Sequence, residues 1–338
     1  MSPRKKKSVH LYRKIISSAL SESWNNRWLW PFALFAAFLM TGGIYDVLLV
    51  SLRDLQSRQD LILRGKLPET VGIAWDRLTD GSSLLHLIGA WEGVVFTLLF
   101  LAIMLGLSIV GQSALVHGIG GRMKGRKPHF RESLAVGSRF FWQTLLLNIF
   151  TLGLTWFAKF LMFIPYRNSI LHPSLGSLSA YLFTAVLFIT VLIALTSVHL
   201  FTLNALILQE ASLHEALSRA FALVKSGWLA ILELALILFG IGMGIFALTF
   251  VLFVIMIIPL VLIVIATLVL GQSFIVTIGL SLGTILFFIL FILAGIFTVT
   301  FQYTAWHLLF LKLGEGGLVA KLHRFSHWLT GSYKPKRA

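Results

Sequence analysis

One acidic residue, Glu233, stands near the start of an apolar run that covers residues 229–311. A carboxyl group inside such a run must be protonated, paired or hydrated, which makes it a candidate for carrying protons or binding a polar ligand. Asn148 and His199 interrupt two other apolar runs. We expect these three side chains to form an inner polar cavity, with three possible further members: Asn204, Gln112 and Gln302. The alternative is that each makes an ordinary hydrogen bond between helices.

A second set of ionisable residues lies toward the opposite ends of the apolar runs. It consists of Asp46, Glu92, Lys159 and His86. Two acids and a lysine at similar depth could pair with one another and line an outward-facing vestibule. The alternative is that each side chain extends separately to the headgroup region, as long side chains near helix ends do.

Familiar catalytic and metal-binding motifs do not fit their context in this chain. The sequence GLSLG at 279–283 matches G-x-S-x-G, but a nucleophile elbow requires a strand-to-helix turn and this motif lies in an apolar run. There and at 240–244 (GIGMG), the small residues are expected to permit close helix packing. The pair His214-Glu215 lacks the second histidine of a zinc helix, and the chain has no cysteine. We predict no catalytic residue, no metal site and no cofactor.

The composition indicates which elements must position these residues. Apolar residues make up 57% and charged residues 12% of the 338 residues, whereas a soluble domain has about 25% charged residues. A helix needs about 20 apolar residues to cross the hydrocarbon core. We therefore predict an all-α, polytopic membrane bundle of about six spans, at 28–52, 84–116, 141–164, 179–208, 228–258 and 274–310. The segment 259–273 could cross, re-enter or extend a neighbouring helix.

Basic residues are distributed asymmetrically between the predicted loops. If both termini are cytoplasmic, the inner segments hold 21 of the 28 Lys and Arg residues, in 1–27, 117–140, 209–227 and 311–338. The outer loop 53–83 holds five basic and five acidic residues. This pattern favours six spans in the plasma (inner) membrane. The formal charge of +15 then reflects contact with anionic lipid headgroups, and nucleic acid is not favoured as a partner.

Three segments share one pattern, in which an amphipathic stretch is followed by a basic residue, a tryptophan and a long apolar run. They are 16–30, 130–142 and 213–228. We expect each to be a short interfacial helix leading into a hairpin of two spans, with hairpins at about 28–116, 141–208 and 228–310. Pro165 and Pro259 are expected to end the outgoing helices of the second and third hairpins. The domain plan is a basic cytoplasmic N-terminal segment (1–27) with an amphipathic helix, a transmembrane domain (28–310) and a basic cytoplasmic tail (311–338).

Two of these segments also carry a resemblance to a known family. Residues 212–228 read S-x-x-E-A-L-x-R followed by K-x-x-W, and 114–142 carries a basic loop with glycines followed by RESLAVGSRFFW. From about residue 84 onward the chain resembles bacterial multi-helix membrane proteins related to the membrane domain of glycerophosphoryl diester phosphodiesterase, a group with uncharacterised six-helix members. The resemblance implies a helical membrane fold. It implies no phosphodiesterase activity, because the catalytic barrel takes about 250 residues and the chain offers no room for it.

Three classes of function are compatible with these features. Long apolar helices, basic inner loops and few buried charges favour a non-enzymatic integral membrane protein that binds lipid or another membrane protein in envelope organisation. A transporter or channel would need a continuous polar path from the outer residues to Glu233, His199 and Asn148. An intramembrane enzyme would need a second carboxylate or a histidine within reach of Glu233.

Overall fold

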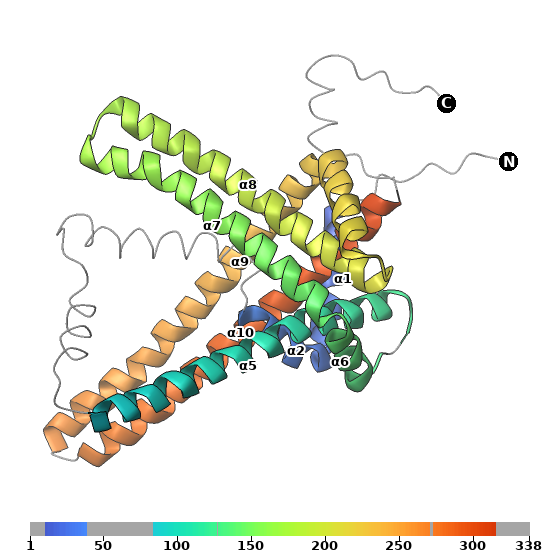
Figure 1. Cartoon of the computed structure of the whole chain (residues 1–338). Coiled ribbons are helices and arrows are strands. Elements are labelled where there is room, and N and C mark those ends of the chain that lie inside the picture. The colour runs from blue at the N-terminus through green and yellow to red at the C-terminus, as the bar shows by residue number, and fades with distance from the viewer. Residues whose placement is uncertain (1–10, 39–83, 127, 271–272, 316–338) are drawn as a thin grey trace, which may run out of the picture.

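A computed structural model describes residues 11–38, 84–126, 128–270 and 273–315. All secondary structure in these ranges is helical (Figure 1). The elements are α1 (Leu11–Asn25), the 3-10 helix η1 (Arg27–Leu29), α2 (Trp30–Phe38), α5 (Leu84–Met123), α6 (Phe130–Arg139), α7 (Phe141–Leu171), α8 (Leu175–Leu208), α9 (Leu213–Leu270) and α10 (Ser273–Gly314).

Five helices in the described ranges are long and apolar enough to cross a membrane. Their qualifying segments are Gly93–Met123, Phe141–Leu171, Leu175–Leu208, Leu213–Pro259 and Ser281–Gly314. The predicted all-α class is therefore confirmed, and these helices indicate a multi-pass membrane protein. Most of the predicted first span (28–52), the outer loop 53–83 and most of the tail lie outside the described residues.

The helices pack most tightly at one end of the molecule, which we call the base. It contains α1, α2, α6 and the adjoining ends of α5, α7, α8, α9 and α10. The large apolar side chains that are fully buried there include Leu115 of α5, Phe201 of α8 and Trp306 of α10. Phe201 contacts Trp306, with ring centroids 6.1 Å apart. The hydrophobic core of the described residues thus lies at this end.

Beyond the base, the helices diverge into two arms. In Figure 1, α7 and α8 run together to the upper left, whereas α5, α9 and α10 run to the lower left. Within the first arm α7 packs against α8, and α9 packs against α10 in the second. Large apolar side chains such as Phe160, Phe183 and Phe288 are exposed along the arms. Such surfaces are compatible with lipid but not with water.

Local signals in the sequence define the turns between the helices. The α7–α8 turn ends at Ser174, which forms a capping box with Ser177: each side chain accepts a hydrogen bond from the other's main-chain N–H. Gly125 ends the turn after α5 with φ of +75°, a conformation that favours glycine.

The two prolines do not end helices, and this expectation was wrong. Pro165 lies inside α7 and Pro259 lies inside α9, and both helices continue beyond them. In an apolar environment main-chain groups can find partners only within the helix, so a helix that loses one hydrogen bond at proline is still favoured over an irregular segment. Of the alternatives for 259–273, α9 itself includes Pro259–Leu270, so this part extends the preceding helix.

Two further boundaries differ from the expected ones. The glycine-containing segment after residue 116 continues α5 to Met123, so the connection to α6 is shorter than predicted. The third amphipathic segment, 213–228, is the first part of α9 and is continuous with the apolar run. The other two amphipathic segments form the separate helices α1 and α6, each followed by a short interruption at Asn26 or Phe140.

Candidate functional site

Polar side chains of α5 and α7 meet inside the base. The hydroxyl oxygens of Ser113 and Thr144 lie 2.8 Å apart, and both side chains are fully buried. One turn further along α7, Asn148 donates to Oε1 of Gln112 at 2.9 Å and to the main-chain oxygen of Thr144 at 2.8 Å. These bonds join two helices at a depth where water cannot replace the partners, so they fix the rotation of α7 against α5.

The same face of α7 reaches α8 one turn beyond Asn148. The Thr151 hydroxyl lies 3.0 Å from Nδ1 of His199 and also donates to the main-chain oxygen of Leu147. Since that hydroxyl proton is used on Leu147, the hydroxyl oxygen is left to accept from Nδ1 of His199. The imidazole is 1% exposed, and its Nε2 has no hydrogen-bond partner among the described residues.

A third polar contact joins α8 to α10. Nδ1 of His307 lies 2.5 Å from Oδ1 of Asn204, and Asn204 also donates to the main-chain oxygen of Leu200. A carbonyl oxygen can only accept, so Nδ1 of His307 donates. Nε2 of His307 lacks a hydrogen-bond partner in the described part of the chain. Asn204 and His307 are 1% and 2% exposed, so this contact is as inaccessible to water as the core of a soluble protein.

Glu233 and Gln302 are buried in the same end of the molecule. Glu233 is 9% exposed on α9, the helix that packs against both α8 and α10, and Gln302 is 4% exposed on α10. The predicted inner residues therefore all lie in the base. A hydrogen bond joins Gln112 directly to Asn148. His199 bonds to Thr151, one turn along α7 from Asn148, and Asn204 bonds to His307, which we had not predicted.

Sequence reasoning missed several members of this network. Thr144 and Thr151 lie one turn on either side of Asn148. Their spacing, with polar residues at i, i+4 and i+7, is the signal that could have identified them. His307 was visible as a second histidine in an apolar run, but nothing in its spacing pointed to Asn204.

Of the predicted outer residues, only the side chain of Lys159 is described. It is half-buried on α7, and its ammonium nitrogen lies 5.2 Å from the ring centroid of Trp156. Asp46 and the side chains of Glu92 and His86 lie outside the described residues. Pairing among the four therefore stays a prediction.

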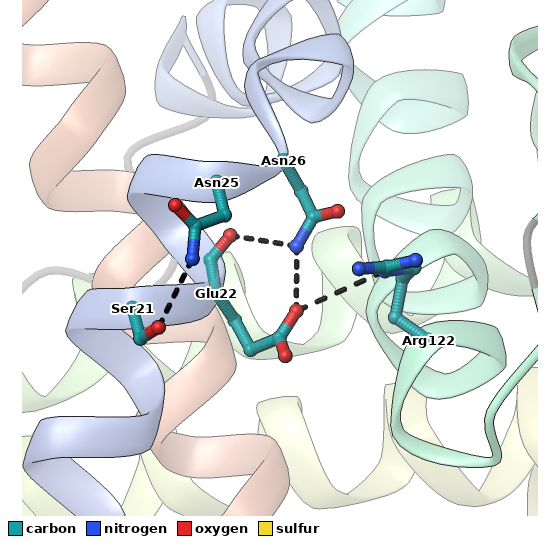
Figure 2. A network of polar contacts seen from close by, with 5 residues as sticks. All are labelled: Ser21, Glu22, Asn25, Asn26 and Arg122. Carbon is teal, nitrogen blue, oxygen red and sulfur yellow. Dashed lines mark hydrogen bonds and ion pairs between the residues drawn. The ribbon is translucent and has the colours of Figure 1, made fainter.

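A polar network also holds α1 against the end of α5 (Figure 2). Glu22 accepts from the Asn26 amide at 2.5 Å, and its carboxylate lies 3.8 Å from Nε of Arg122. Asn26 also donates to the main-chain oxygen of Glu22 at 2.9 Å. Both charged side chains are about a third exposed, at 34% for Glu22 and 31% for Arg122. This contact orients α1 and contributes little to stability, because solvent screens it.

Basic and tryptophan side chains are exposed on the helices and turns that form the base. We call the exposed basic residues of the base the basic rim. Its members are Arg13, Lys14, Arg27, Lys124, Arg126, Arg131, Arg139, Arg219, Lys225 and Lys312. Trp24, Trp142 and Trp228, which are also exposed, accompany them. The Arg27 guanidinium lies 5.1 Å from the ring centroid of Trp24. Amphipathic aromatic rings and cations in this arrangement are typical of a membrane–water interface.

The arrangement provides polar contacts within the base and cations outside it, but no group of three or more metal-ligating side chains occurs among the described residues. No protein-family model, curated protein or solved structure matches the chain. Function must therefore be argued from the geometry alone.

Proposed function

We propose that the protein is a non-enzymatic, multi-pass protein of the plasma membrane that binds anionic lipid. The headgroups contact the basic rim and the acyl chains lie along the arms. One observation carries this proposal: exposed cations and tryptophans lie at the ends of helices whose remaining length exposes large apolar side chains. A phospholipid has a matching arrangement. Its anionic headgroup would lie against the cations and tryptophans, and its apolar chains would lie along the exposed apolar side chains of the arms.

The charge balance of the rim supports an anionic ligand. Some rim cations have acidic partners: Arg139 with Glu210 at 3.3 Å, and Arg219 with Glu215. Others have no ion pair with a described side chain, among them Lys124, Arg126 and Lys225. Each cation near an anionic membrane surface contributes about 1 kcal/mol to binding. Several unpaired cations on one rim would therefore hold anionic headgroups in preference to neutral ones.

The proposal includes the predicted architecture of six spans in three hairpins, with both termini in the cytoplasm. The packing at the base supports it. Taking α2 with α5, α7 with α8 and α9 with α10 as units, the second helix of each unit packs against its own partner and against the first helix of the next. Thus α5 contacts α7, α8 contacts α9, and α10 contacts α2. A ring of three equivalent units would produce this cyclic pattern.

Native mass spectrometry of the purified chain tests lipid binding. The chain would be transferred from detergent into discs of phosphatidylglycerol or of phosphatidylcholine, and bound lipids counted. Replacing Lys124, Arg126 and Lys225 by Gln should weaken phosphatidylglycerol binding by about 3 kcal/mol, or about a hundredfold. Arg219→Gln combined with Glu215→Gln, which removes an ion pair from the rim without changing the net charge, is the control and should leave binding unchanged. Equal retention of the two lipids by the unaltered chain would exclude the proposal.

A further inference from the structure

Helix α7 carries polar side chains on one face along most of its length. We call this face the α7 stripe; its members are Thr144, Asn148, Thr151, Thr155, Lys159 and Tyr166. At 3.6 residues per turn these positions fall within a sector about 80° wide. At about 1.5 Å per residue the stripe is about 33 Å long, close to the ~30 Å thickness of the hydrocarbon core. Met162 is the only apolar residue in this sector between Lys159 and Tyr166.

The stripe has two parts with different surroundings. In the base, its first three members bond to Ser113, Gln112 and His199 of neighbouring helices. In the arm, Thr155 donates only to the main-chain oxygen of Thr151 at 2.8 Å, and its described contacts include no bond to another helix. Lys159 follows one turn later with no carboxylate within ion-pair distance among the described side chains. The base part is therefore explained by helix packing, and at the far end Tyr166 lies against Tyr181 of α8, with ring centroids 5.8 Å apart. Packing does not explain Thr155 and Lys159.

The charge along this arm has one sign. Helices α7 and α8 contain no Asp or Glu, and their only lysine and arginine are Lys159 and Arg167. A lysine part of the way across the hydrocarbon core costs several kcal/mol unless it reaches water or a counter-ion. Arg167 follows near the far end of α7, so both cations of this arm lack an ion pair with any described side chain. This series favours a ligand with negative charge.

The surroundings of the stripe favour a lipid over a free ion. The α7–α8 arm stands apart from α9 and α10 in Figure 1, so its flanks are not enclosed by the other helices described. Beside the stripe on α7, Leu152 and Trp156 are exposed by 51% and 55%. A free anion would have apolar neighbours on this open side, whereas a phospholipid would place its acyl chains against these side chains.

We propose that the α7 stripe is a track along which phospholipid headgroups cross the membrane while their acyl chains stay in the bilayer, so that the protein exchanges lipid between the two leaflets without an energy source. The inference rests on the proposed lipid binding and adds a direction of movement to it. The phosphate would leave the base beside Thr151 and pass Thr155 and Lys159 to Arg167.

The test uses liposomes of phosphatidylcholine and phosphatidylglycerol that contain the full chain and a trace of phosphatidylglycerol labelled with a nitrobenzoxadiazole dye. Dithionite bleaches the dye in the outer leaflet only, so slow further bleaching reports arrival from the inner leaflet. Lys159→Met combined with Thr155→Val should slow this phase at least about tenfold, the equivalent of about 1.4 kcal/mol. Lys159→Arg should preserve it.

A matched threonine serves as the control. Thr190 on α8 also donates to the main-chain oxygen one turn earlier, at 2.9 Å, but has no place on the stripe. Thr190→Val should therefore exchange lipid at the rate of the unaltered chain. Size-exclusion profiles and helical circular dichroism establish that each variant is folded, and Lys159→Met alone replaces the double variant if that one aggregates.

The outcomes separate this inference from the function on which it rests. If the unaltered chain binds phosphatidylglycerol but does not accelerate bleaching, or if the stripe variant is as fast as the unaltered chain, the track is wrong and lipid binding stands. If phosphatidylglycerol does not bind at all, both proposals fail. Leakage of trapped chloride without lipid exchange would indicate an ion path in place of the track.

Discussion

The contact between Asn204 and His307 allows a quantitative test of how the base is held together. Both side chains are almost completely buried, and their hydrogen bond joins α8 to α10 across residues far apart in the sequence. Asn204→Leu would leave the Nδ1–H of His307 without an acceptor. An orphaned buried donor costs about 1–3 kcal/mol, so we expect this variant to lose stability within that range. His307→Phe should cost a comparable amount because it orphans the asparagine oxygen.

Comparing the double variant with the two single variants isolates the energy of the hydrogen bond from the other effects of replacing each side chain. When both partners are apolar, no polar atom of the pair remains unsatisfied, so the double variant should be more stable than the two single losses predict. Hydrogen bonds between membrane helices contribute about 0.6 kcal/mol on average and about 1.7 kcal/mol at most. We therefore expect a coupling energy between Asn204 and His307 of about 1 kcal/mol. Loss of the bond from Asn204 to the main chain of Leu200 cancels in the cycle, because it occurs in both arms.

Unfolding in mixed micelles, with increasing sodium dodecyl sulfate and helicity read by circular dichroism, would provide the four free energies. All four proteins should have the same transition slope, which would indicate that they expose similar surface on unfolding. A coupling energy within about 0.3 kcal/mol of zero, the usual range for independent sites, would refute the reasoning. The two residues would then stabilise the base separately and the short contact would carry no net energy.

Two further predictions concern close packing and topology. A Cβ on Gly137 would lie 2.6 Å from the main-chain oxygen of Val110, so Gly137→Ala should cost about 1–3 kcal/mol in the same unfolding assay. The matched change Gly240→Ala, where no described atom lies within 4 Å, should stabilise α9 by up to about 1 kcal/mol. Because the chain has no cysteine, Arg126→Cys and Pro173→Cys can be labelled singly with an impermeant maleimide in intact cells and in inverted vesicles. The two sites should react from opposite sides of the membrane, and labelling of both from the same side would contradict the proposed topology.

Hydropathy predicted where helices occur far better than where they end. The predicted spans at 141–164 and 179–208 correspond to α7 and α8, because a long apolar run has no other satisfactory backbone conformation in lipid. The same argument explains why Pro165 and Pro259 fail to end their helices. Local propensity counts against a helix there, but leaving the helix in hydrocarbon would orphan more main-chain groups than the single bond that proline removes.

The contacts between helices could not be predicted from the sequence, because they depend on how each helix is rotated. Composition identified Asn148, His199 and Asn204 as notable, yet their partners include hydroxyls and a second histidine that no motif marks. Glycines show the same limit. The motif at 240–244 predicted close packing, but a Cβ at Gly240 or Gly244 would meet no described atom within 4 Å. At Gly137, which no spacing rule singled out, a neighbouring main chain leaves no room.

The distribution of polar groups separates what holds the protein together from what it does. Lipid tails are as apolar as leucine, so burial of apolar side chains gives membrane helices little reason to associate, and the hydrogen bonds and close glycine contacts of the base must provide it. Thr144, Asn148 and Thr151 are accounted for in this way. Lys159 contributes nothing to the base, and its charge makes the arm less stable in hydrocarbon. A residue that is unfavourable for the fold and unnecessary for its packing is best explained by a ligand. Because Lys159 lies on the stripe, the ligand that we propose is a phospholipid headgroup moving along it.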